Sequence, residues 1–194
     1  MGNSTFNEHI KPSLVLVIIC LVVSIALSQV YAITLPLIES ITAKTADQTR
    51  TVVLPKADTF TPYTGKLQDG IVDFYIANNG AGAAITATAN SYGGLITVMV
   101  GIDAKGAITG VKVMSHSDTP GLGTKAQTPE YLSQYNGMTG AEIIPDANAI
   151  GQGTIKDNTN LDAITGATIS SNGVYHSVQR ALAQFEAAGG ENNE

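Results

Sequence analysis

Residues 162–171 read Asp-Ala-Ile-Thr-Gly-Ala-Thr-Ile-Ser-Ser and join an Asn/Asp-rich loop to a helical pattern. Four hydroxyl side chains gather at this junction around two small residues: Thr165, Thr168, Ser170 and Ser171. The free amides and the positive dipole end of a helix N-terminus suit an anion, above all a phosphate. Ser and Thr are also common helix N-caps, so the spacing alone favours an ordinary helix start.

An amphipathic helix is expected directly after this stretch, over residues 171–187. Apolar side chains recur there at three- and four-residue spacings on one face, at Val174, Val178, Ala181, Leu182 and Phe185. Gly189-Gly190 is predicted to end the helix, and the acidic tail after it to fray. Thr168 would then lie just ahead of a rigid, packed element.

Upstream of this helix, four segments have the composition and spacing of β-strands. They are Ile71–Ala77, Ala83–Ala89, Leu95–Ile102 and Ala107–Met114. Asn79-Gly80 and Asp103–Gly106 supply hairpin turns between them. The connections are short, which predicts a twisted, mainly antiparallel sheet. With flanking helices, the fold class is α+β.

A short helix and an irregular region are expected between the sheet and residue 162. Thr128-Pro129-Glu130 has the pattern of a helix start, with an N-cap, a proline and an acid in order. Tyr131 and Tyr135 are interpreted as core residues of this helix. Residues 138–161 are predicted to be irregular, with one strand around Gly153–Lys156.

The N-terminal region carries no charged residue from Pro12 to Ile38. About 20 apolar residues span a bilayer core as a helix, so a single transmembrane anchor is expected, with Pro36 ending or kinking it. A cleavable signal peptide with a small-residue site at 30–32 is the alternative. A lipoprotein anchor at Cys20 is disfavoured by Ile19 before it and by the apolar run that continues past it.

Charge does not orient this anchor. One lysine, Lys11, precedes the span, and Lys44, Arg50 and Lys56 follow it, so the positive-inside count does not place the C-terminal domain outside. The expected organisation is a tail and anchor at 1–38, a linker at 39–60, a globular domain at 61–188 and a disordered tail at 189–194.

Composition excludes several classes of function. The 194 residues include 10 Lys and Arg against 16 Asp and Glu, a net charge of −6, and no basic cluster. Nucleic acid is therefore excluded as a partner, because neutralising phosphates needs a basic face. The single cysteine allows no intramolecular disulfide and no cysteine-rich iron–sulfur or zinc site. His116 is remote in sequence from the other histidines, and no metal site is expected.

Two glycine-rich segments precede the threonine stretch. Taken alone, Tyr92-Gly93-Gly94 favours a glycine bend at a sheet corner over close approach of a ligand. His116-Ser117-Asp118-Thr119-Pro120-Gly121-Leu122-Gly123 follows a predicted strand. Pro120-Gly121 within it fits a β-turn with positive φ at the glycine.

Together these segments resemble the FMN-binding domain of the G subunit of Rnf complexes and of the C subunit of the sodium-pumping NADH:quinone reductase. The motif Asp162-x-x-Thr165-Gly166-Ala167-Thr168 resembles that family's flavinylation motif. The resemblance implies that Thr168 carries FMN through a phosphoester bond and that Asp162 serves recognition by a flavin transferase. Asp118 stands where the family usually has Glu. The implied flavin walls are Thr165, Gly166, Ala167, Ile169, Tyr92, Gly93, Gly94, Thr119, Pro120, Gly121 and Leu122, with His116 and Asp118 nearby.

The resemblance further implies an electron-transfer flavoprotein subunit, with covalent FMN, of a membrane-bound ferredoxin:NAD⁺ oxidoreductase that moves Na⁺ or H⁺. Its partners would be the other membrane subunits and the flavin transferase, with the domain on the extracytoplasmic side. The chain would not be a complete enzyme alone and would supply no catalytic side chain. It lacks the Gly-x-Gly-x-x-Gly pattern of a dinucleotide site. A stand-alone membrane-anchored FMN carrier and a non-redox binding or scaffold module are the alternatives.

Overall fold

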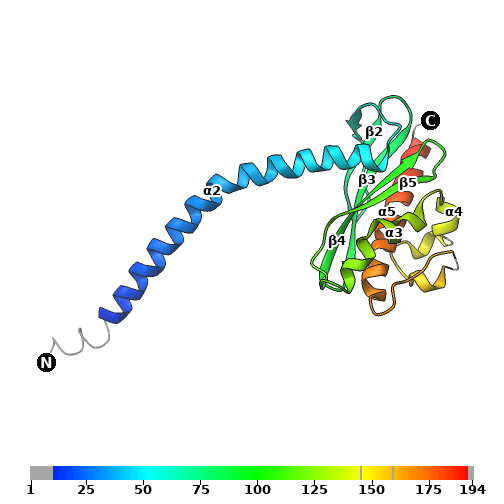
Figure 1. Cartoon of the computed structure of the whole chain (residues 1–194). Coiled ribbons are helices and arrows are strands. Elements are labelled where there is room, and N and C mark those ends of the chain that lie inside the picture. Colours follow the sequence, from blue (N-terminus) through cyan, green and yellow to red (C-terminus); the bar gives the residue numbers. More distant parts are fainter. Residues whose placement is uncertain (1–10, 145, 159, 192–194) are drawn as a thin grey trace. The chain divides into compact units, whose positions relative to one another are not determined.

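The computed structural model describes residues 11–144, 146–158 and 160–191, and it divides between Thr45 and Ala46 into two compact units. The expected N-terminal tail before Lys11 and the last three residues of the expected C-terminal tail lie outside the described residues. Figure 1 shows the helix that begins the described chain and the sheet-and-helix domain.

The first unit is formed by a single helix, α2, which spans Lys11–Val53 and continues into the second unit. Among the described residues it is the one helix long and apolar enough to cross a membrane, with a mean hydropathy of 2.7 over its most apolar 18 residues. Of the end or kink expected at Pro36, the end is wrong, because the helix continues through that residue. A proline removes one backbone hydrogen bond, a loss that long apolar helices tolerate.

The second unit is built on a five-stranded antiparallel sheet with strand order β1-β2-β3-β4-β5. Its strands are β1 (Phe60–Pro62), β2 (Ile71–Ala77), β3 (Gly82–Ser91), β4 (Gly94–Asp103) and β5 (Ile108–Ser115). The four predicted strands and the antiparallel sheet are therefore confirmed. The strands succeed one another in space as in sequence, because each connection is a short turn or loop.

One face of the sheet packs against the long helix α5, which spans Thr168–Glu191 (Figure 1). The core between them is aliphatic, with Val174, Val178, Ala181 and Leu182 on the helix against Ile85, Ile96, Val98 and Val100 on the sheet, all fully buried. The helix begins three residues earlier than expected. It also continues through Gly189 and Gly190, so the predicted end there is wrong. Ala188 is buried in the same core, which holds the last turn in place.

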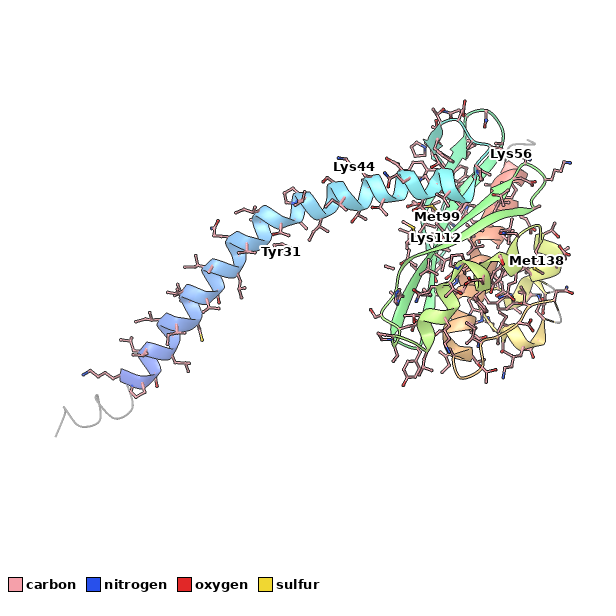
Figure 2. All side chains as sticks on the ribbon, in the orientation of Figure 1. Tyr31, Lys44, Lys56, Met99, Lys112 and Met138 are labelled. Atoms are coloured by element: carbon pink, nitrogen blue, oxygen red, sulfur yellow. The ribbon has the colours of Figure 1, made fainter. Side chains whose placement is uncertain are left out.

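The opposite face of the sheet packs against the last turns of α2. Val53 contacts Ala84 and Met99 there, and Figure 2 labels Met99 on this part of the sheet. Arg50 is buried on the same surface, where its guanidinium lies 3.5 Å from the centroid of the Tyr75 ring and pairs with Asp47. The second half of the segment at 39–60 therefore belongs to the globular unit.

Short helices cover the remaining edge of the core. They are η2 (Gly123–Gln127), α3 (Pro129–Leu132), η3 (Ser133–Tyr135), α4 (Gly140–Ile143), η4 (Ala147–Ala149) and η5 (Ile155–Asp157). The Thr128 hydroxyl caps α3 as predicted, accepting a hydrogen bond from the N–H of Tyr131. The strand expected around Gly153–Lys156 is wrong. Thr154 and Asp157 instead form a reciprocal capping box that winds this segment into η5.

Candidate functional site

The first segment of the site is a two-residue hairpin turn. Ser91 at the end of β3 pairs with Gly94 at the start of β4, so Tyr92 and Gly93 form the turn between them. The Tyr92 side chain is 69% exposed. A Cβ on Gly93 would overlap the carbonyl oxygen of Ser117, so only glycine allows this turn to lie so close to the loop after β5. The segment is thus a hairpin tip rather than a bend between hairpins.

The second segment is the loop that follows β5. The N–H of Leu122 donates to the carbonyl of Thr119 at 3.3 Å, and Gly121 between them has a φ of +79°. With Pro120 at the second position, this is the predicted turn. Asp118, at the start of the loop, is 4% exposed. Its carboxylate accepts hydrogen bonds from the hydroxyl of Ser91 and the backbone N–H of Gly93.

The third segment is the turn that leads into α5. The N–H of Ala167 donates to the carbonyl of Ile164 at 3.0 Å, and Gly166 between them has a φ of +81°. The hydroxyl of Ser171 accepts from the N–H of Ile164 and donates to the carbonyl of Ala167. These bonds fix the turn to the helix. Thr168 is consequently the first residue of α5 rather than a residue ahead of it.

These three segments, far apart in the sequence, enclose one pocket of about 570 Å³. Its lining residues are Tyr92, Thr119, Leu122, Gly123, Gly166, Ala167, Thr168, Ile169 and Ser170. The volume lies in the range of small-molecule and cofactor sites. The pocket therefore unites the tyrosine turn, the proline–glycine loop and the threonine motif.

The N-terminus of α5 supplies polar groups to the lining of this pocket. The backbone N–H groups of Thr168, Ile169 and Ser170 belong to the first turn of α5, where a helix has no carbonyl of its own to receive them. Ala167, directly before the helix, has no side-chain oxygen to cap them. These donors and the helix dipole suit a phosphate without a lysine or arginine.

Three exposed apolar side chains also line the pocket. Tyr92, Leu122 and Ile169 are 69%, 52% and 56% exposed. A cluster of large apolar groups left open to water is a common property of ligand sites. A planar, largely apolar ring would cover these side chains while its phosphate met the helix N-terminus, so the residues present fit FMN.

Comparison with known proteins identifies the family of this chain. The model of the FMN-binding domain matches residues 91–183, which include every lining residue of the pocket. The G subunit of the proton-translocating ferredoxin:NAD(+) oxidoreductase complex of Clostridium ljungdahlii is 30% identical, over 87% of each chain. The G subunit of the Na(+)-translocating ferredoxin:NAD(+) oxidoreductase complex of Acetobacterium woodii is 30% identical, over 91% of each chain. This chain belongs to the family of these G subunits.

Two further proteins are similar to the chain. The G subunit of the ion-translocating oxidoreductase complex of Methanosarcina acetivorans is 30% identical, over 96% of this chain and the whole of that protein. The crystal structure of Shewanella oneidensis NqrC aligns with a TM-score of 0.43 and 22% identity, over 63% of this chain and 62% of that one.

In this member of the G-subunit family, several residues expected at the site lie outside the pocket lining. Thr165, Pro120 and Gly121 shape the turns that bear lining residues, as Gly93 and Gly94 do at the hairpin tip. Asp118 lies behind the wall. His116 accepts a hydrogen bond through Nδ1 from the N–H of Asp118 at 3.3 Å.

Asp162 is held through its backbone. Its N–H donates to the side-chain oxygen of Gln134 at 2.8 Å, its carbonyl accepts from the amide of the same residue, and the residue is exposed. An exposed carboxylate beside the threonine motif is accessible to a modifying enzyme.

Gly123 and Ser170 also line the pocket; both belong to segments singled out in the sequence, although neither is among the individually named flavin walls. Gly123 ends the same loop as Leu122, and a Cβ on it would lie 2.6 Å from the Ser170 hydroxyl and 2.7 Å from Cβ of Asp118. Its lack of a side chain was a visible signal for close contact. Ser170 was noted as one of the four hydroxyls at the helix start, but its burial depends on where α5 begins.

Two tyrosines of the core have raised pKa values. Tyr131 and Tyr135 pack edge to face, as expected of core residues, and burial raises the pKa of both phenols, so both stay neutral at physiological pH. Across residues 11–144, 146–158 and 160–191, no group of three or more His, Cys, Asp or Glu side chains is arranged to hold a metal ion.

Proposed function

We propose that this chain is the electron-transfer flavoprotein subunit of an Rnf-type membrane complex, a ferredoxin:NAD⁺ oxidoreductase that moves Na⁺ or H⁺. In this proposal FMN is bound covalently to Thr168. The pocket carries the proposal: Thr168 lines a cavity whose other walls are Tyr92 and the loop at 119–123, at the N-terminus of a long helix.

The proposed bond joins Oγ1 of Thr168 to the phosphorus of FMN. Its formation requires an activated flavin nucleotide, whose diphosphate bond breaks as the new ester forms, releasing a nucleoside monophosphate. The proton of the Thr168 hydroxyl leaves to a base on the flavin transferase, with Asp162 as an exposed recognition carboxylate. The covalent tether explains why phosphate retention needs no cationic side chain in the pocket lining.

Bound FMN would supply one-electron redox chemistry, and the protein would supply position and electrostatics. Gly166 and Ala167 leave room for the phosphate beside the backbone, since a Cβ on Gly166 would meet nothing within 4 Å. Tyr92, Leu122 and Ile169 would exclude water from the faces of the ring.

The proposed location is the cell membrane, with α2 as the anchor and the domain on the extracytoplasmic side. The length and hydropathy of α2 support the anchor. The side of the membrane rests on the resemblance to the flavinylated family, whose flavin transferase works outside the cytoplasm. The other membrane subunits of the complex would be the partners of this chain.

Fluorescence of the denatured protein tests the attachment. The full chain, expressed with a flavin transferase and separated under denaturing conditions, should give a fluorescent band. Thr168→Val should give a dark band of equal protein content. Thr119→Val removes another hydroxyl from the pocket lining and should stay fluorescent. A dark wild-type band with active transferase overturns the proposal, and so does a fluorescent Thr168→Val band.

A further inference from the structure

We infer that Asp118 is a positioning residue that acts through Tyr92: its carboxylate holds the β3–β4 hairpin tip so that the Tyr92 ring forms the wall of the pocket. The inference rests on the proposed FMN site and adds to it a residue that need not touch the cofactor.

The hydrogen bonds to the Asp118 carboxylate come from the two neighbours of Tyr92. Oδ1 accepts a hydrogen bond from the backbone N–H of Gly93 at 2.7 Å, and Oδ2 accepts from the hydroxyl of Ser91 at 2.6 Å. One carboxylate thus bonds the residue before Tyr92 and the residue after it. Among the described residues no cation pairs with this buried carboxylate, so these two donors provide its hydrogen bonding.

Asp118 is closely packed, at its backbone by Gly93 and at its side chain by Gly123. A Cβ on Gly93 would lie 2.7 Å from the backbone nitrogen of Asp118, and a Cβ on Gly123 would lie 3.0 Å from its carboxyl carbon. Gly123 lines the pocket, so Asp118 lies directly behind the wall. Its neighbour Thr119 also lines the pocket, which makes Asp118 the link between two walls of the same cavity.

The Tyr92 ring needs such a link because little of its own surface is packed. With 69% of the residue exposed at the tip of a two-residue turn, its position follows the backbone of the turn. Fixing the backbone of the turn costs conformational entropy, which the two charge-assisted hydrogen bonds to Asp118 offset. Removing the Asp118 carboxylate would free the backbone of the β3–β4 hairpin tip while the Tyr92 ring stayed in the protein.

Flavin emission in the full, flavinylated chain reports this position, because a phenol ring in contact with a flavin quenches its fluorescence by electron transfer. Asp118→Ala should raise native-state emission toward that of Tyr92→Ala. In the Tyr92→Ala background, Asp118→Ala should add no further rise. Asp118→Asn keeps an acceptor for Gly93 and offers a donor to Ser91, so it should retain wild-type emission.

Three results would overturn the inference: unchanged emission in Asp118→Ala, a further rise in the double variant, or a rise in Asp118→Asn equal to that in Asp118→Ala. If Asp118→Ala fails to fold by circular dichroism, Ser91→Ala removes one of the two donors and should give a smaller rise, with unchanged emission counting against the inference. Intact mass shows whether each variant carries FMN. A wild type without FMN overturns the proposed function as well, whereas a flavinylated but unresponsive series overturns the positioning role alone.

Discussion

Gly101 of β4 lies directly beneath the backbone of Val53 at the end of α2, so closely that a Cβ on the glycine would overlap the Val53 carbonyl oxygen. That same oxygen accepts a hydrogen bond from the hydroxyl of Thr109 on β5. The end of α2 therefore packs directly on the sheet backbone at Gly101, where no side chain intervenes. The last turns of α2 are part of the domain core rather than a linker to it.

Gly101→Ala should therefore lower the free energy of unfolding by about 1–3 kcal/mol, the usual cost of overpacking a core. Chemical denaturation of the full chain measures the change. Gly189→Ala is the control, because its Cβ would meet nothing within 4 Å in a helix and should stabilise by about 0.5–1 kcal/mol. Equal stability of the two variants would contradict the close packing of Val53 on Gly101.

Gly166→Ala tests the turn before α5. The φ of +81° costs a side chain about 1–2 kcal/mol, although open space surrounds the site. We expect reduced stability and less FMN on Thr168, because the turn sets the start of the helix. Gly166→Asn should lose less stability and less FMN than Gly166→Ala, since Asn tolerates this conformation. Full flavinylation of Gly166→Ala at wild-type stability would show that the turn does not need its glycine.

His176 should make stability fall in mild acid. Burial lowers the pKa of this imidazole below its ordinary value of 6.5, and the nearby Arg180 acts in the same direction. As pH falls through about 6.5, the unfolded chain binds a proton before the folded one does, so folding loses free energy until the lowered pKa is passed. Nε2 of His176 lies 3.1 Å from the Gly153 carbonyl.

The midpoint of chemical denaturation, measured above and below the ordinary pKa of histidine, tests this prediction. His176→Gln keeps an N–H donor for Gly153 but does not titrate, so its midpoint should fall less than that of the wild type. Carboxylates contribute equally to both proteins, and the difference between them isolates His176. If the midpoints of the wild type and of His176→Gln changed equally with pH, the prediction would be wrong.

A labelling experiment can determine on which side of the membrane the domain lies. Cys20 is the sole cysteine of the chain, and Ala104 is an exposed residue in the turn between β4 and β5. In a Cys20→Ala, Ala104→Cys variant, a membrane-impermeant thiol reagent should label intact cells as fully as lysed ones. Labelling that requires lysis would place the domain in the cytoplasm.

Local signals in the sequence account for much of this fold. Asn79-Gly80 and the alternating segments predicted the strands and their antiparallel order, because turn chemistry and period-two patterning act over a few residues. The capping box at Thr154 was equally local, but this segment was interpreted as a strand. Pro36 was weighed by its intrinsic cost alone, and the long helix continues past it.

Longer-range features had no such signal. The Asp118 carboxylate accepts hydrogen bonds from Ser91 and Gly93, which are more than twenty positions away in the sequence. No residue spacing predicts that the loop after β5 will contact this hairpin tip. The docking of Val53 on Gly101 joins segments further apart still. The family resemblance implied that the three motifs of the pocket share one site, whereas their local patterns alone did not, and it is the sheet that places them together.

The mass of the intact chain, produced with an active flavin transferase, tests the central claim most directly. We predict an increment equal to FMN less one water, lost in Thr168→Val and mapped to the peptide that contains Thr168. An unmodified mass, or the same increment on a peptide without Thr168, would contradict the account.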